Sequence, residues 1–132
     1  MKTGVWIDLK KAVLVHLHND KKEIKTLLSE IEPQERTPGQ SKDFVRFGNQ
    51  FSNLEKQKEN RLKNQTKEYM KRVADELSHS DAFVIFGPAG MKHELEKLVL
   101  KDKKLNTKLK GVKTADSMTD NQTAAWVVDF FK

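Results

Sequence analysis

A long stretch without proline constrains this chain more than any other feature. No proline occurs in residues 41–78, and Gly48 is the single glycine there. Apolar residues recur at spacings of three and four at both ends of the stretch, but within residues 55–68 Leu62 is the one strongly apolar residue. A helix docked along its whole length keeps an apolar stripe. The pattern therefore predicts a helix over about 41–78, open to a break near Gly48, that projects beyond the body of the protein.

Short apolar segments on either side of that helix predict the strands of a sheet. Three of them precede the helix and are joined by short polar links: residues 4–9, 12–18 and 23–31. Tight links favour an antiparallel meander. Residues 81–87 form a continuous apolar run that ends at Gly-Pro, which is typical of a central strand buried on both faces. The predicted order ends with a helix over 91–100, a lysine-rich link, a strand around 109–116 and a helix that begins at a capping box of Thr119 and Gln122.

The predicted order of elements is β-β-β-α-β-α-β-α. It predicts an α/β fold in which three antiparallel strands and two later strands form one mixed sheet with helices on its faces. The ribonuclease-H-like architecture has the same element order. One domain over residues 1–132 accommodates all of these elements. Residues 32–40, with two prolines and a glycine, predict a loop between the third strand and the long helix.

The charge balance indicates an anionic partner. The formal net charge is +6, with 33% charged residues, and such a balance favours nucleic acid among partners. The chain has no cysteine, which excludes disulfides, thiolate metal sites and thiol nucleophiles. Its apolar runs are far shorter than the ~20 residues that span a bilayer, and its first residues lack a signal-peptide pattern. We therefore expect a cytoplasmic protein without membrane contact and without a cofactor.

The predicted loop leads into the sequence Pro38-Gly39-Gln40-Ser41. By residue type alone this is a type II turn in which Ser41 caps the long helix. Basic side chains follow along the helix, and with one loop residue they form the candidate RNA-binding set: Arg36, Lys42, Arg46, Lys56, Lys58, Arg61, Lys63 and Lys67. Two explanations fit such a run of charged residues equally well. One is a solvated helix face, and the other is a surface that follows the phosphates of a nucleic acid.

This region and the element order together resemble the middle domain of eukaryotic and archaeal class I release factors and of Pelota-type rescue factors. In that family a Gly-Gly-Gln loop lies between the third strand and a long basic helix, and serine and an Arg-Phe pair follow it. Here residues 39–41 are Gly-Gln-Ser, and Arg46-Phe47 follows after a gap about two residues longer. Residues 83–99 are similar to the family's strand, Gly-Pro turn and helix. The resemblance covers nearly the whole chain, which implies a stand-alone, bacterial-type relative of that one domain.

The resemblance implies a translation-associated protein that contacts the ribosome, through rRNA or tRNA, with the loop and the basic helix. It assigns Gln40 and Gly39 to peptidyl-tRNA hydrolysis in ribosome rescue, where a preorganised donor stabilises the developing oxyanion. The family's first glycine is Pro38 in this chain, and proline narrows the backbone shapes of the loop. Two functions stay open: an enzyme that hydrolyses peptidyl-tRNA, and a non-catalytic protein- or RNA-binding module that keeps the fold and has lost release activity.

Three further groups of polar residues are interpreted as structural. Asp8 lacks the convergent acids that metal-dependent phosphodiester cleavage needs, so it is interpreted as a strand-end or turn residue. His16 and His18 share one face of a strand without a third ligand, which indicates a solvated sheet face and no metal site. Six lysines within residues 101–113, opposed by Asp102 alone, indicate a flexible solvated link, or a second RNA contact if the link lies on the same side as the long helix.

Overall fold

The computed structural model describes residues 1–31 and 48–132, with side chains described for 1–31 and 60–132. The predicted loop over 32–40 and the first part of the predicted long helix, 41–47, lie outside the described residues. The helices and strands of the described residues are β1 (Lys2–Ile7), β2 (Lys11–His18), β3 (Lys21–Leu28), α2 (Gly48–Leu77), β4 (Ala82–Gly87), α3 (Met91–Lys101), α4 (Lys103–Asn106), β5 (Leu109–Thr114) and α5 (Asp120–Phe130).

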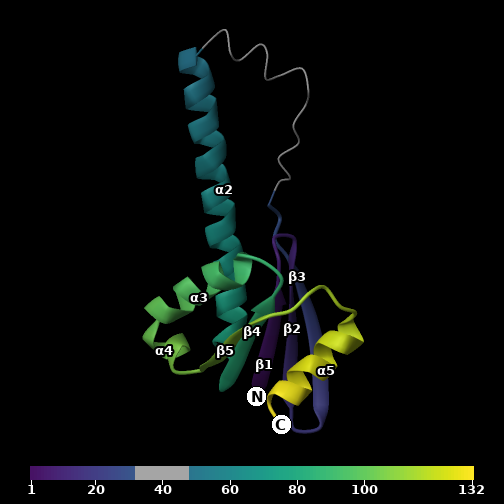
Figure 1. Ribbon diagram of the computed structural model, residues 1–132. Coiled ribbons are helices and arrows are strands. Elements are labelled where there is room, and N and C mark those ends of the chain that lie inside the picture. Colours follow the sequence, from purple (N-terminus) through teal and green to yellow (C-terminus); the bar gives the residue numbers. More distant parts are fainter. Residues whose placement is uncertain (32–47) are drawn as a thin grey trace.

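Five strands form one mixed sheet in the order β3-β2-β1-β4-β5. β1 pairs antiparallel with β2, and β2 pairs antiparallel with β3, as the short links predict. β4 adds parallel to β1, and β5 adds parallel to β4. This arrangement confirms the predicted α/β class with a mixed sheet. Figure 1 shows α2 rising far beyond the strands.

Helices cover both faces of the sheet (Figure 1). On one face, α2, α3 and α4 contribute Tyr69, Leu95 and Leu105 to a buried apolar cluster. On the other face, α5 packs through Val127 against the inner strands. All six residues of β4 are buried, which confirms the prediction of a central strand. β3 is an edge strand whose side chains are exposed, apart from the half-buried Leu27.

The lysine-rich link before β5 is folded against the body of the protein. It contains α4, a single helical turn, and the N-cap Asp102 accepts a hydrogen bond from Lys104 N at 2.9 Å. Lys108 Nζ donates to the Ser78 carbonyl at 3.0 Å, which ties the link to the end of α2. The interpretation as a flexible link is therefore wrong. Although its sequence is polar, the segment is held by a contact with Ser78, thirty residues earlier in the chain. The capping box of Thr119 and Gln122 is present as predicted.

His16 is buried, so its interpretation as a solvated residue is wrong. Its side chain is 6% exposed, and Nδ1 lies 2.8 Å from Thr3 Oγ1, which also hydrogen-bonds Ser80 Oγ. The sheet order explains this burial, since β2 is an inner strand and the end of α2 covers this face. His18, at the end of the same strand, is exposed as predicted.

The burial of His16 makes the stability of the fold depend on pH. Desolvation lowers the pKa of His16 below its ordinary value, with Lys25 and His18 acting in the same direction and the carboxylates of Glu23 and Glu76 opposing it. Because the folded state binds this proton more weakly than the unfolded state, the stability is complete above about pH 6.5 and falls as the pH drops through that value.

We therefore expect the free energy of unfolding in urea to be lower at about pH 5.5 than at about pH 7.5. His16→Gln should weaken this pH dependence, because the titrating group is gone. His18→Gln removes an exposed imidazole that makes a minor contribution to the same shift, so it should leave most of the dependence in place. An unchanged pH dependence in His16→Gln would contradict this assignment.

Gly87 ends β4 in a backbone conformation that favours glycine. Its φ is +158°, and a Cβ built there would lie 2.2 Å from the Ile7 carbonyl oxygen, whereas a Cβ on Gly90 would meet nothing within 4 Å. We expect Gly87→Ala to lower the free energy of unfolding by about 2–4 kcal/mol through strain and overlap. Gly90→Ala should change it by less than about 1 kcal/mol. Urea denaturation of the two variants tests this, and equal effects would speak against it.

Candidate nucleic-acid interface

α2 is docked by its last third and projects from the sheet over the preceding turns (Figure 1). Its 30 residues, at ~1.5 Å each, give a length of about 45 Å. Among its described side chains, the buried ones all follow Glu68: Tyr69, Met70, Val73, Ala74 and Leu77. Between Asn60 and Glu68 every side chain is exposed or half-buried. The described residues thus confirm a helix that packs at its C-terminal end and is solvated in its middle.

Polar contacts fix the direction of α2 where it meets the sheet. Tyr69 Oη donates to the Asp8 carbonyl at 3.0 Å, so the helix is held at the turn between β1 and β2. Burial raises the pKa of the Tyr69 hydroxyl well above its ordinary value, and the nearby Asp8 adds to the shift. Lys25 of β3 forms an ion pair with Glu76 of the helix. One contact comes from the turn between β1 and β2 and the other from the middle of β3, so together they restrain the angle of α2 to the sheet.

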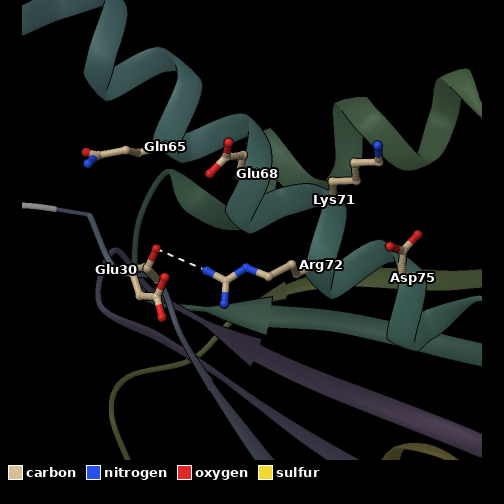
Figure 2. A pocket seen from close by; sticks show the side chains of 7 residues that line it. Glu30, Gln65, Glu68, Lys71, Arg72 and Asp75 are labelled. Carbon is tan, nitrogen blue, oxygen red and sulfur yellow. Dashed lines mark hydrogen bonds between the residues drawn. The ribbon is translucent and has the colours of Figure 1, made fainter.

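Arg72 makes a further contact between α2 and the sheet. Its guanidinium donates to the carbonyls of Leu28 and Ser29, at 3.0 and 3.2 Å, at the point where β3 ends. Figure 2 shows the Arg72 side chain extending from α2 toward the segment that holds Glu30. The arginine is therefore engaged by backbone oxygens. Sequence reasoning could not have found this role, because Arg72 lies more than forty residues after Leu28 and Ser29 in the chain.

A hollow of about 620 Å³ lies between the end of β3 and α2. Seven residues line it: Ser29, Glu30, Gln65, Glu68, Lys71, Arg72 and Asp75 (Figure 2). Its charges are mixed, with three acids against two bases, and one of the bases already binds carbonyl groups. Such a lining does not favour an anion. A second, more open hollow of about 420 Å³ continues along α2 and is lined by Asn60, Arg61, Asn64, Gln65 and Glu68.

The structure describes the side chains of some of the predicted RNA-binding residues and not of others. Arg61, Lys63 and Lys67 are exposed on the projecting part of α2. Lys63 and Lys67 are four residues apart, so they lie on one side of the helix. Lys56 and Lys58 belong to α2, but their side chains lie outside the described part. The other candidates lie outside the described residues altogether: Arg36, Gly39, Gln40, Lys42 and Arg46.

Asp8 has a structural role, as predicted. Its Oδ1 accepts hydrogen bonds from Lys10 N and Lys11 N, both at 2.8 Å, and so shapes the turn between β1 and β2. Within residues 1–31 and 48–132, no three His, Asp or Glu side chains are arranged to hold a metal ion. Across the same part of the chain, no helix is both long enough and apolar enough for a membrane span.

Comparison with solved structures shows a similar fold in an archaeal protein. The crystal structure of the archaeal translation termination factor aRF1 matches with a TM-score of 0.52 at 12% sequence identity. The match covers 98% of this chain but 38% of the termination factor, so this chain corresponds to well under half of that protein. No protein-family model and no curated protein matches the sequence. At this identity the comparison shows a shared fold, which agrees with the release-factor-like architecture that the sequence predicts.

Proposed function

We propose that this chain is a translation-associated protein of the cytoplasm, which contacts the ribosome or tRNA through the predicted loop over 32–40 and the basic residues of α2. The similarity of fold to a translation termination factor over nearly the whole chain supports this proposal. We also propose that the sheet is of the ribonuclease-H-like type. Its three antiparallel strands and two parallel additions, in the order β3-β2-β1-β4-β5, support that classification.

The observation that carries the proposal is the way in which α2 is docked. Residues 48–68 precede the buried part of the helix and extend for about 30 Å. None of the described side chains in this part of the helix is buried. Packing against the core therefore does not account for the exposed lysines that it carries. A cationic rod of this length, fixed at its base by Tyr69 and Arg72, can reach phosphates in a crevice that the body of the protein cannot enter.

Co-sedimentation with ribosomes over a salt series tests the contact. Binding through lysine and arginine to phosphates should be strong at about 50 mM salt and should fall by orders of magnitude toward about 200 mM. A protein that stays in the supernatant at the lowest salt would contradict the proposal. Binding that is insensitive to salt would mean that the chain contacts a ribosomal protein and not RNA phosphates. That result would favour the alternative function, a non-catalytic binding module.

Peptidyl-tRNA hydrolysis by Gln40 and Gly39 is the catalytic form of the same proposal. A preorganised donor at the developing oxyanion is worth about 10²–10³ in rate, so Gln40→Ala should lower peptide release by that factor while ribosome binding stays constant. Gln34→Ala changes a second glutamine of the predicted loop and is the matched control. Release from ribosome–nascent-chain complexes is the measurement. A wild-type protein that binds ribosomes and releases nothing would establish the binding module instead.

A further inference from the structure

We propose that the corner formed by the end of α3, α4 and the start of β5 is a second nucleic-acid-binding surface, which holds phosphates independently of α2. The corner carries five lysines: Lys101, Lys103, Lys104, Lys108 and Lys110. All of them are exposed except Lys108, which is half-buried. Lys113, near the end of β5, lies beside Gly111 on the face that α5 covers and is not part of the corner. The residues altered in the test below lie outside α2, and its probe is a short RNA duplex and not the ribosome, so this proposal and the proposed function can fail separately.

The one acid of the corner is engaged by the backbone. Asp102 Oδ1 accepts the hydrogen bond of Lys104 N as the N-cap of α4, so it supports the turn that presents the lysines. Leu105 of the same turn is 4% exposed and packs into the core. Lys103 and Lys104 therefore extend from a folded support. In the described part of the chain no carboxylate forms an ion pair with either of them.

The edge strand β5 adds a lysine that is set apart from the sheet. Leu109 pairs with Phe83 and Gly111 pairs with Val84, so Lys110 is the extra residue of an irregularity in the ladder. Bulges at sheet edges re-aim the side chain of the extra residue. β5 has a neighbour on one side only, and Lys110 is exposed beside its open edge.

The corner lies on the same side of the sheet as α2. Leu105 of α4 and Tyr69 of α2 belong to one apolar cluster, and Lys108 donates to the carbonyl of Ser78 just after α2. Figure 1 shows α4 near the foot of α2, away from its projecting end. Lys67 precedes Leu77 by ten residues, which corresponds to about 15 Å along the helix axis. One RNA molecule can therefore touch both surfaces.

The chemistry of the corner selects the phosphate backbone over the bases. Lysine ammonium groups act as point charges that attract phosphates and release counterions, which gives affinity without sequence preference. An acidic protein offers the same sign of charge, but a nucleic acid offers it at regular spacing along a rigid duplex. The structure therefore assigns the corner to nucleic acid, and an acidic protein becomes an outcome of the test.

The test measures binding of a short, fluorescently labelled RNA duplex by anisotropy from about 50 to 200 mM salt. The variant Lys103→Gln/Lys104→Gln/Lys110→Gln removes three charges from the corner. It should lower the affinity about tenfold at the lower salt concentrations and reduce the slope of log K against log salt by about 2–3. Thermal melting by circular dichroism shows whether the variant is folded, and Lys101→Gln/Lys104→Gln is the second variant if it is not.

The matched control is Lys10→Gln/Lys21→Gln/Lys22→Gln, which removes three exposed lysines from the strand turns. It should keep the wild-type slope to within about one unit. Equal losses in the control and the corner variant would overturn the proposal, because they would show an effect of net charge alone. Polyglutamate that binds as tightly as the duplex and is lost equally in the corner variant would overturn the assignment to nucleic acid in favour of an acidic protein.

Discussion

Replacing Lys63 and Lys67 with glutamate should remove most ribosome binding at about 100 mM salt. The two side chains lie on one side of the projecting part of α2, and the double substitution changes their combined charge from +2 to −2. Two phosphate contacts become two repulsions, so we expect the affinity to fall about 30- to 100-fold. The slope of log K against log salt should become less steep by about two. Co-sedimentation over a salt series measures both quantities.

The control for this experiment is Lys21→Glu/Lys22→Glu. Both lysines are exposed at the start of β3, so the change in net charge is the same while α2 is untouched. We expect this variant to bind ribosomes within about threefold of wild type. If both double variants lose binding equally, α2 is not the contact surface, and the proposed function loses the observation that carries it.

Tyr69→Ala should be among the most destabilising single substitutions in this protein. The Tyr69 side chain is fully buried where α2 meets the sheet, and its hydroxyl donates to the Asp8 carbonyl. Truncation removes the ring from the core and leaves a cavity, for which we expect a loss of about 3–5 kcal/mol in the free energy of unfolding. Domains of this size are stable by about 5–15 kcal/mol, so the variant loses a large share of its stability. Urea denaturation monitored by circular dichroism is the measurement.

Two companion variants separate the causes of that loss. Tyr69→Phe keeps the ring and removes the hydrogen bond to Asp8, for which we expect about 1 kcal/mol. Leu62→Ala truncates a half-buried side chain on the projecting part of the same helix and should cost less than about 1 kcal/mol. A large effect of Leu62→Ala would mean that the projecting part is packed, which contradicts the docking described above.

Elements with a strong local signal were predictable from the sequence. The apolar run of β4 indicates burial on both faces. The capping box of Thr119 and Gln122 marks the start of α5, before the first buried residue of that helix. The solvated middle of α2 was also predictable, because Leu62 alone interrupts a polar stretch. In each case the determining residues are neighbours in the sequence, so periodicity and capping chemistry suffice.

Features that depend on distant partners were not predictable. Alternation places His16 and His18 on one face of β2, but it does not say that the end of α2 covers one of them and leaves the other exposed. The same holds for the ion pair of Lys25 with Glu76, whose partners are 51 residues apart. These contacts follow from the sheet order, which the sequence alone does not determine.

The docking of α2 by its last third also separates two thermodynamic regimes within one helix. The turns around Tyr69–Leu77 are held by the core, so we expect their amides to exchange with solvent only when the whole domain unfolds. Residues 60–68 lack buried anchors, and short helical segments in water are marginal on their own. Their amide protons should therefore exchange through local fraying. A partner that binds this part of α2 would slow that exchange, so the affinity for the partner includes the conformational entropy lost when the helix is ordered.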